Sequence, residues 1–399
     1  MIAPGSSFTT IREQLSAIQE ALRAQGLDGW LLYDLRARNV IASRLLGLGE
    51  LSRRYFVLIP AQGEPFALTH GIEQGPWRQW PWKKTVYVSW RSLDDAMQAA
   101  LAGRRRVAME LSARDAVPVC DLVPAGVAEL VRAAGVDVVS SGDLITLFYS
   151  RWSAEQLDAH RRAAVALAAG AQQAFEQLAR DVAAGRAPSE GVVRERLIED
   201  LHHRGFAVAD CIAATGLNAA NPHYEPVDGG ARFARGDIVL IDLWCKESDD
   251  AVWADQTWMA CLAERVPERA ESLFATVCAA RDAAIRFLKD EWASGRSIQG
   301  HQVDDVARAV ITKAGYGDYF IHRTGHSIDI ATHGMGPNID NLETHETRVL
   351  LPGVGFSIEP GIYIPGEIGL RSEINVYIGE SGPEVTPSRL QHAMATFPV

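Results

Sequence analysis

Two apolar segments in the second half of the chain each run directly into a carboxylate, which limits the folds available to it. The first is residues 238–242, IVLID, and a polar turn separates it from a second candidate strand at 251–257. Apolar, β-branched runs joined by a short polar turn predict an antiparallel hairpin. A hairpin centred on Ser248–Asp249 places Asp242 directly opposite Asp255, with their Cβ atoms about 5 Å apart on one face.

A second predicted hairpin repeats this arrangement further along the chain. Segments 355–359 and 369–373 both end in glutamate, and folding about Gly366 places Glu359 opposite Glu373. Facing acids repel, and burying them without a partner costs several kcal/mol each, so a bound cation would stabilise both pairs. Four carboxylates and a histidine suit two borderline divalent ions about 3.5–4 Å apart.

Candidate histidines lie between the two hairpins and just before the first one. His322, His326 and His333 fall within twelve positions, in a segment that also contains glycines. A single histidine is usually a packed or surface residue, but three so close together favour a functional site. His223 lies in the loop Asn221–Pro226, directly before the first carboxylate strand.

The length and the order of the apolar segments indicate two domains. A chain of 399 residues exceeds one ordinary core, and we place the boundary near Tyr149–Trp152, giving domains 1–152 and 153–399. Alternating strands and helices predict an α/β first domain. Its expected helices are 11–25 and 93–102, and its expected strands are 30–33, 55–60, 85–89 and 106–109. In the second domain, helices are expected at 154–183, 188–203, 266–294 and 299–314, and Ser153 with Gln156 predicts a capping box.

Composition excludes several classes of protein. The net charge of −11 argues against a nucleic-acid partner, because such proteins usually carry a basic patch. Five widely spaced cysteines without a C-x-x-C pair predict neither disulfides nor a cysteine zinc site. The N-terminus lacks the pattern of a secretory signal, and no apolar run approaches the roughly 18 residues of a membrane span. We therefore expect a cytoplasmic protein with no membrane partner.

Four tryptophans in the first domain allow two interpretations. They are Trp77, Trp80, Trp82 and Trp90, which cluster among a few basic residues. We favour packing against a domain or subunit surface. An aromatic wall for a substrate is the alternative.

The spaced motifs together resemble those of the family that contains creatinase, prolidase, aminopeptidase P and methionine aminopeptidase. The motifs are NPHY, IVLID, an Asp-x-Thr strand, HRTGH followed by a histidine seven residues later, IEPGIY and RSE. The resemblance covers residues from about 155 to the end and implies the α+β pita-bread fold. The first domain looks like the α/β domain found in creatinase, prolidase and aminopeptidase P. The metal ligands that the resemblance implies are Asp242, Asp255, His326, Glu359 and Glu373.

The resemblance also implies roles for the neighbouring side chains. His223 and His333 match histidines that contact the scissile peptide, His322 matches a substrate-side histidine, and Arg371 matches a group that supports the carboxylates. Glu359 is the best candidate to move a proton during hydrolysis. In a dipeptidase, Arg371 or Arg348 would be candidates to hold the carboxylate of the substrate.

The expected activity is hydrolysis of Xaa-Pro peptide bonds with two divalent ions, which the ligand types allow to be manganese, zinc or cobalt. We favour a dipeptidase acting on a small proline-containing peptide, with an aminopeptidase acting on longer peptides as the alternative. A creatinase-like hydrolase without metal, or a binding module without catalysis, fits less well because all five ligand positions hold ligand types. We also expect a homodimer.

The sequence departs from the family pattern at several positions. Asp255 follows Asp242 by thirteen positions, two more than usual. Ser327 and Asp329 replace glycines that usually follow the histidine ligand, and Gly334 replaces a common glutamate. Residues 207–215 lack the tyrosine that prolidases often carry near the metals. These departures put the substrate fit in question, whereas the metal ligands are retained.

Overall fold

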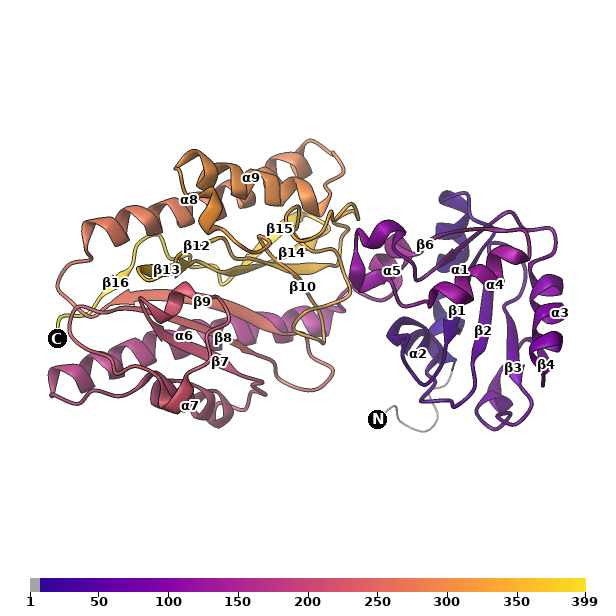
Figure 1. Ribbon diagram of the computed structural model, residues 1–399, viewed down its shortest axis with the longest axis horizontal. Coiled ribbons are helices and arrows are strands. Elements are labelled where there is room, and N and C mark those ends of the chain that lie inside the picture. The colour runs from indigo at the N-terminus through magenta and orange to yellow at the C-terminus, as the bar shows by residue number, and fades with distance from the viewer. Residues whose placement is uncertain (1–7) are drawn as a thin grey trace. The chain divides into compact units, whose positions relative to one another are not determined.

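The computed structural model describes residues 8–399 and divides the chain into two compact units, Met1–Tyr149 and Ser150–Val399 (Figure 1). This division lies three residues before the end of the expected first domain, 1–152. All residues implicated in chemistry lie in the second unit.

The first unit is built on one mixed, six-stranded sheet of order β4-β3-β2-β1-β5-β6. The strands are β1 Gly29–Asp34, β2 Tyr55–Pro60, β3 Phe66–His70, β4 Lys83–Tyr87, β5 Arg106–Met109 and β6 Asp137–Ser140. The helices are α1 Thr9–Ala24, α2 Val40–Leu46, α3 Trp90–Leu101, α4 Ala125–Ala133 and α5 Gly142–Phe148. β1 pairs antiparallel with β2 and parallel with β5. The α/β class expected for this unit is confirmed, although the expected strand at 85–89 begins two residues earlier.

The tryptophans of the first unit separate into a packed group and an exposed one. Trp77 and Trp80 are buried and contact Phe8, with ring centroids 5.6 and 5.1 Å away. Trp82 packs edge-on against Trp80, whereas 60% of Trp90 is exposed. Core packing therefore accounts for most of the cluster.

The second unit contains four long helices and three sheets. The helices are α6 Ala154–Ala183, α7 Glu190–His203, α8 Glu268–Ala293 and α9 Gly300–Lys313. One sheet has the order β16-β9-β8-β7, formed by β7 Cys211–Thr215, β8 Ile238–Cys245, β9 Ala254–Cys261 and β16 Ala395–Thr396. Another has the order β10-β11-β14-β15, formed by β10 Ser327–Ile328, β11 Gly355–Ile358, β14 Ile374–Gly379 and β15 Gly382–Thr386. The third is the hairpin of β12 Gly361–Ile364 and β13 Ile368–Arg371.

Short 3-10 helices complete the described elements. They are η1 Pro76–Gln79, η2 Ala113–Asp115, η3 Pro118–Cys120, η4 Asn218–Ala220, η5 Val227–Gly229 and η6 Gly317–Tyr319.

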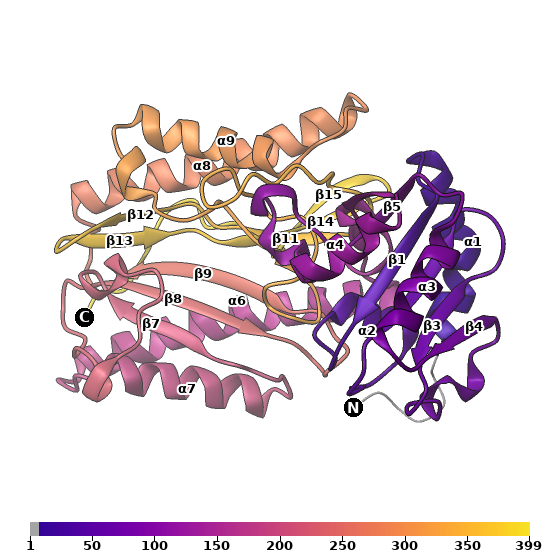
Figure 2. The ribbon, with the colours of Figure 1, turned by 45° about the vertical axis from the view of Figure 1, so that its right-hand side comes forward.

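The helices of the second unit lie outside its sheets. α6 and α7 pack against β7, β8 and β9, while α8 packs against α9 and the strands of the other sheets (Figures 1 and 2). Strands β13 and β14 contact β9, so the two halves of this unit meet along their strands. At the start of α6, Ser153 and Gln156 form the expected capping box. The helices thus cover the outer faces of the sheets, and the strands of the two halves meet between them.

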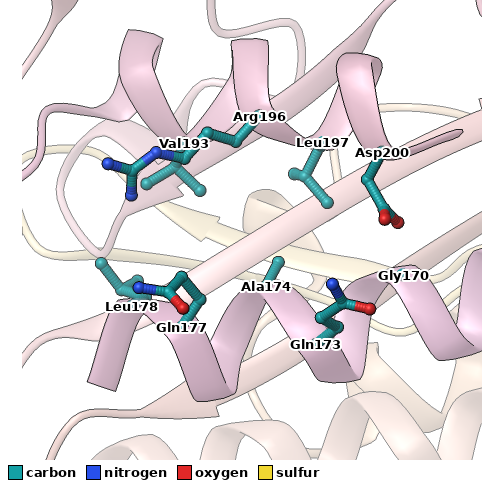
Figure 3. Close-up of a pocket in the computed structure, with 9 residues that line it drawn as sticks. All are labelled: Gly170, Gln173, Ala174, Gln177, Leu178, Val193, Arg196, Leu197 and Asp200. Atoms are coloured by element: carbon teal, nitrogen blue, oxygen red, sulfur yellow. The ribbon is translucent and has the colours of Figure 1, made fainter. Parts of the chain in front are cut away.

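A small pocket lies between α6 and α7 on the outside of this unit (Figure 3). It is lined by Gly170, Gln173, Ala174, Gln177, Leu178, Val193, Arg196, Leu197 and Asp200. Its volume of about 90 Å³ is room for only a few water molecules, too little for a peptide.

Two expectations about the whole chain can be compared with the structure. The five cysteines are all buried, and none of them forms a disulfide within residues 8–399, in agreement with the spacing of the cysteines in the sequence. Within residues 8–399, none of the helices combines the length and the apolar character that crossing a membrane would require.

Candidate active site

The first carboxylate hairpin forms, but its register differs from the expected one. Asp242 lies opposite Thr257, and Asp255 lies opposite Trp244, so the expected direct pairing of the two acids is wrong. The connection between β8 and β9 is longer than expected, because β9 begins only at Ala254. The centre of the hairpin therefore lies one residue further along the chain than Ser248–Asp249. The residue opposite Asp242 is two positions away from the expected one, and side chains two positions apart on a strand point to the same face. Asp242 and Asp255 therefore still share a face, as diagonal neighbours.

Lys246 contributes to the longer connection of this hairpin. Its ammonium group donates to the carbonyl oxygens of Asp249 and Ile330, both at 3.0 Å. These bonds tie the connection to a loop distant in the sequence, which a prediction from local pattern does not include.

The second carboxylate pair has the predicted register. Ile358 pairs with Ile374 between β11 and β14, and Gly361 pairs with Arg371 between β12 and β13. Glu359 and Glu373 lie between these two ladders, opposite each other in the same register. The expected facing of two glutamates is therefore present.

His326 is held between the two acid pairs by its backbone. The chain passes so close to Ser357 here that a Cβ on Gly325 would lie 1.9 Å from the Ser357 carbonyl oxygen, so only glycine fits. The imidazole Nδ1–H donates to the carbonyl of Ser327 at 3.1 Å. Its Nε2 then carries the lone pair and lies 3.5 Å from Glu359 Oε1 and 3.7 Å from Asp255 Oδ2.

The donor atoms of this cluster lie close enough together to hold a divalent cation. Ligand atoms of Asp255, His326 and Glu373 all lie within 4.8 Å of one another, and all three residues are buried. Asp242 Oδ1 is buried without a hydrogen-bond partner, which leaves an oxygen lone pair to be satisfied. Oxygen and imidazole donors of this kind fit manganese, zinc or cobalt.

Burial and repulsion shift the pKa values of the cluster. Burial, followed by repulsion from neighbouring carboxylates, raises the pKa of Asp255 and of Glu373 well above the usual range. Burial also raises the pKa of Asp242, which the positive charge of Arg371 opposes. Burial lowers the pKa of His326 to about 3, so the imidazole is neutral, as a ligand must be.

Arg371 is the cation in direct contact with these acids. It forms a short ion pair with Asp242, and its Nε lies 3.8 Å from Glu373 Oε2. The same Nε donates to the hydroxyl of Thr257 at 2.8 Å, and this hydroxyl donates to Glu373 at 2.8 Å. Thr257 belongs to the Asp-x-Thr motif, but no role at the site was predicted for it, although its position two residues after Asp255 places it on the same face of the strand.

Nine of the predicted residues line one cavity of about 450 Å³ in the second unit. They are His223, Asp242, Asp255, His322, His326, His333, Glu359, Arg371 and Glu373. The rest of the lining is Asp210, Ile212, Pro222, Tyr224, Glu225, Trp244, Arg323, Thr332 and Glu343. This volume is within the range of cavities that enclose small ligands.

The three histidines outside the proposed ligand set have different surroundings. His333 is exposed, and its ring centroid lies 4.3 Å from that of His326 in an edge-to-face arrangement. Although the residue is exposed to the cavity, the protein around its ring displaces part of the hydrating water and lowers the pKa of His333 to about 4, and His326 and Arg323 act in the same direction, so it is neutral at pH 7. His223 is also exposed, on the loop after η4. Both rings can reach a substrate in the cavity.

His322 has both ring nitrogens in contact with protein groups. Its Nδ1 donates to the carbonyl of Arg323 at 2.6 Å, and its Nε2 lies 2.8 Å from the hydroxyl of Tyr363. No role was predicted for Tyr363, because the folding of the β12–β13 hairpin is what brings its hydroxyl to His322. His322 is therefore fixed as part of the cavity wall.

The loop that carries His333 contains the departures noted in the sequence. The Asp329 carboxylate accepts hydrogen bonds from the backbone N–H groups of Ala331, at 2.7 Å, and Met335, at 3.0 Å. A Cβ on Gly334 would lie 2.8 Å from the Asp329 carboxylate. With aspartate at position 329, position 334 therefore has to be glycine, because the Asp329 carboxylate occupies the space that a side chain at 334 would need.

Two other expectations concern residues around the cavity. Arg348 does not line it: its guanidinium forms a two-pronged ion pair with Glu346 and donates to the carbonyls of Met335 and Gly336. Ile212 lies opposite Asp242 on β7 and lines the cavity, so an aliphatic side chain is present on the strand that lacks the usual tyrosine.

Comparison with known proteins places these observations in a family context. Residues 158–380 match the sequence model of metallopeptidase family M24. A Mycobacterium tuberculosis protein named probable dipeptidase PepE is 27% identical over 349 residues, covering 86% of this chain and 85% of that protein. The Xaa-Pro dipeptidase of Lactobacillus helveticus is 36% identical over 175 residues, covering 43% of this chain and 42% of that protein.

A solved structure extends the likeness to both units. The crystal structure of dipeptidase PepE from Mycobacterium ulcerans has a TM-score of 0.70 at 24% identity, covering 98% of this chain and 99% of that one. The expected architecture, an α/β first unit followed by a pita-bread second unit, is confirmed.

Proposed function

The chain belongs to metallopeptidase family M24, and we propose that it is an Xaa-Pro dipeptidase that works with two divalent ions. The observation that carries the proposal is the cluster of four carboxylates, three of them buried, around a neutral His326, in a cavity sized for a small peptide. The substrate class is taken from relatives named Xaa-Pro dipeptidase.

The proposed metal ligands are the five residues that bring oxygen and nitrogen donors together. They are Asp242, Asp255, His326, Glu359 and Glu373. Divalent ions held in such a site activate a water molecule as nucleophile and polarise the scissile carbonyl.

Glu359 is the proposed proton carrier. Its side chain is 13% exposed, more than those of Asp255 and Glu373, so it faces the open part of the cavity. The hydroxyl of Ser357 donates to Glu359 Oε1 at 2.9 Å and holds the carboxylate in place. Glu359 takes the proton of the attacking water and delivers it to the leaving nitrogen.

His333 and His223 are proposed to bind the reacting peptide. A neutral imidazole donates one N–H, and a donor aimed at the carbonyl oxygen stabilises the negative charge that develops there. The low pKa of His333 keeps it neutral, so it donates a hydrogen bond without adding a third cation beside two metals. His322 is proposed to shape the wall on the substrate side, held there by Tyr363.

The test compares peptides that differ in one feature at a time. Metal-free protein is reloaded with manganese, zinc or cobalt and assayed on Ala-Pro, Ala-Leu and Ala-Pro-Gly. We expect activity to depend on the added metal and to be fastest on Ala-Pro. Equal cleavage of Ala-Leu contradicts proline specificity, and faster cleavage of Ala-Pro-Gly identifies an aminopeptidase instead.

A further inference from the structure

A dipeptidase has to recognise the free carboxylate at the end of its substrate, and the cavity contains two arginines. These are Arg323 and Arg371. In a dipeptide, the carboxylate lies only about 3.5 Å further along the chain than the scissile bond, so its partner must lie within the same cavity. The two guanidinium groups differ in whether they are available.

Arg371 is already committed to the acid cluster. Besides Asp242, Thr257 and Glu373, its Nη1 faces the hydroxyl of Tyr363 at 3.4 Å, and only 3% of the residue is exposed. Transfer of this guanidinium to a substrate would leave buried carboxylates without their cation, which costs several kcal/mol. Arg371 is therefore unavailable to a substrate.

Arg323 has the opposite character. Its backbone is held from both sides, since its N–H donates to Glu343 at 2.9 Å and its carbonyl accepts from His322 at 2.6 Å. Its side chain is half-buried in the cavity wall, and within residues 8–399 its guanidinium forms no ion pair or hydrogen bond. The backbone of Arg323, three residues before His326, is therefore fixed, while its guanidinium remains available to an anion.

We infer that Arg323 binds the C-terminal carboxylate of the peptide and so restricts the enzyme to dipeptides. The inference rests on the proposed function for the location of the scissile bond. A guanidinium binds a carboxylate through two parallel N–H···O bonds, which fixes its position as well as its charge. A longer peptide would place a neutral amide there and forgo that interaction.

The charge of Glu343 makes the guanidinium necessary for binding an anion at this place in the cavity. Its carboxylate lines the same cavity and already accepts the backbone N–H of Arg323. A substrate carboxylate beside Glu343 would be repelled without Arg323, so removal of the guanidinium exposes the substrate to an uncompensated negative charge.

The experiment measures the ratio of kcat/KM for a free acid to that for its amide, using Ala-Pro with Ala-Pro-amide and Ala-Leu with Ala-Leu-amide. In the wild type we expect the acid to be preferred. In Arg323→Met this ratio should fall about 10- to 100-fold, mainly through KM for the acid, because a charged hydrogen bond is lost. Arg323→Lys should retain part of the preference, since it keeps the charge without the two-pronged geometry.

Arg235→Met is the matched control, because it removes the same charge from an exposed arginine outside the cavity. It should leave the ratio as in the wild type. An Arg323→Met ratio equal to the wild-type ratio, or a wild type that does not distinguish acid from amide, would overturn the inference. A wild type that prefers Ala-Leu would reject the proline specificity proposed above but leave this test intact, since the acid-to-amide comparison is made within each pair.

Discussion

The histidines His326 and His333 provide the sharpest test of the site, because their rings touch while their proposed roles differ. We expect His333→Ala to retain both metals and to lower kcat about 10²–10³-fold. This loss corresponds to about 2.7–4 kcal/mol, the usual effect of removing one donor to a developing oxyanion. Because His333 is exposed, its replacement should change the free energy of unfolding by no more than about 0.5 kcal/mol.

His326→Ala should behave differently because its Nε2 faces two buried carboxylates. We expect lower metal occupancy together with lower activity. The assay is elemental analysis, melting temperature and kcat on the same preparations, with His333→Gln as a control that retains an N–H donor. Metal loss in His333→Ala with full occupancy in His326→Ala would reverse the two roles. Unchanged kcat in both would place the chemistry elsewhere.

Three further predictions test the metals, the electrostatics and the packing of the second unit. Elemental analysis should find up to two divalent ions per chain, and full activity in chelator would refute metal dependence. Burial lowers the pKa of the His160 imidazole in the folded protein to about 4. Below pH 6.5 the unfolded chain therefore binds a proton at this residue that the folded chain does not bind, and the folded state loses stability as the pH falls. The wild type should lose about 2 kcal/mol more of its unfolding free energy than His160→Gln between pH 7.5 and pH 5, measured by urea titration, and parallel losses would reject this. Gly325→Ala should lower Tm by about 3–10 °C, because the added Cβ would meet a backbone carbonyl oxygen. Gly216→Ala is the control and should not lower Tm, because its Cβ would make only ordinary contacts at 3.9 Å. Equal Tm values for the two variants would contradict the packing argument.

The hairpin of Asp242 and Asp255 shows what local pattern can and cannot predict. Alternation of side chains fixes which face each acid occupies, and the structure has both on the predicted face. The register depends on the connection, where Lys246 bonds to the carbonyl of Ile330, far along the chain. Such a contact is not encoded in the spacing of the acids, so the predicted partners were two residues away from the observed ones.

The cavity wall was only partly predictable for the same reason. The spacing of the histidines identified the segment, but the partners of His322 and Arg348 come from distant elements. Tyr363 reaches His322 across the fold, and Glu346 keeps Arg348 outside the cavity. An arginine in a sequence gives no sign of whether a carboxylate already neutralises it, and for that reason Arg323 was not recognised before its surroundings were known.

The ion pair between Arg371 and Asp242 has a consequence for the order in which the site fills. In the fully ionised form that binds metal, four carboxylates and one guanidinium give the cluster a formal charge of −3. One divalent ion reduces this to −1, and a second changes it to +1, so the second ion enters against a much weaker attraction. Two unequal affinities are therefore expected, and full occupancy should depend on the free metal concentration. The site with both ions bound carries a net positive charge. It is then complementary to the negative charge that develops on the scissile carbonyl oxygen when the peptide is attacked.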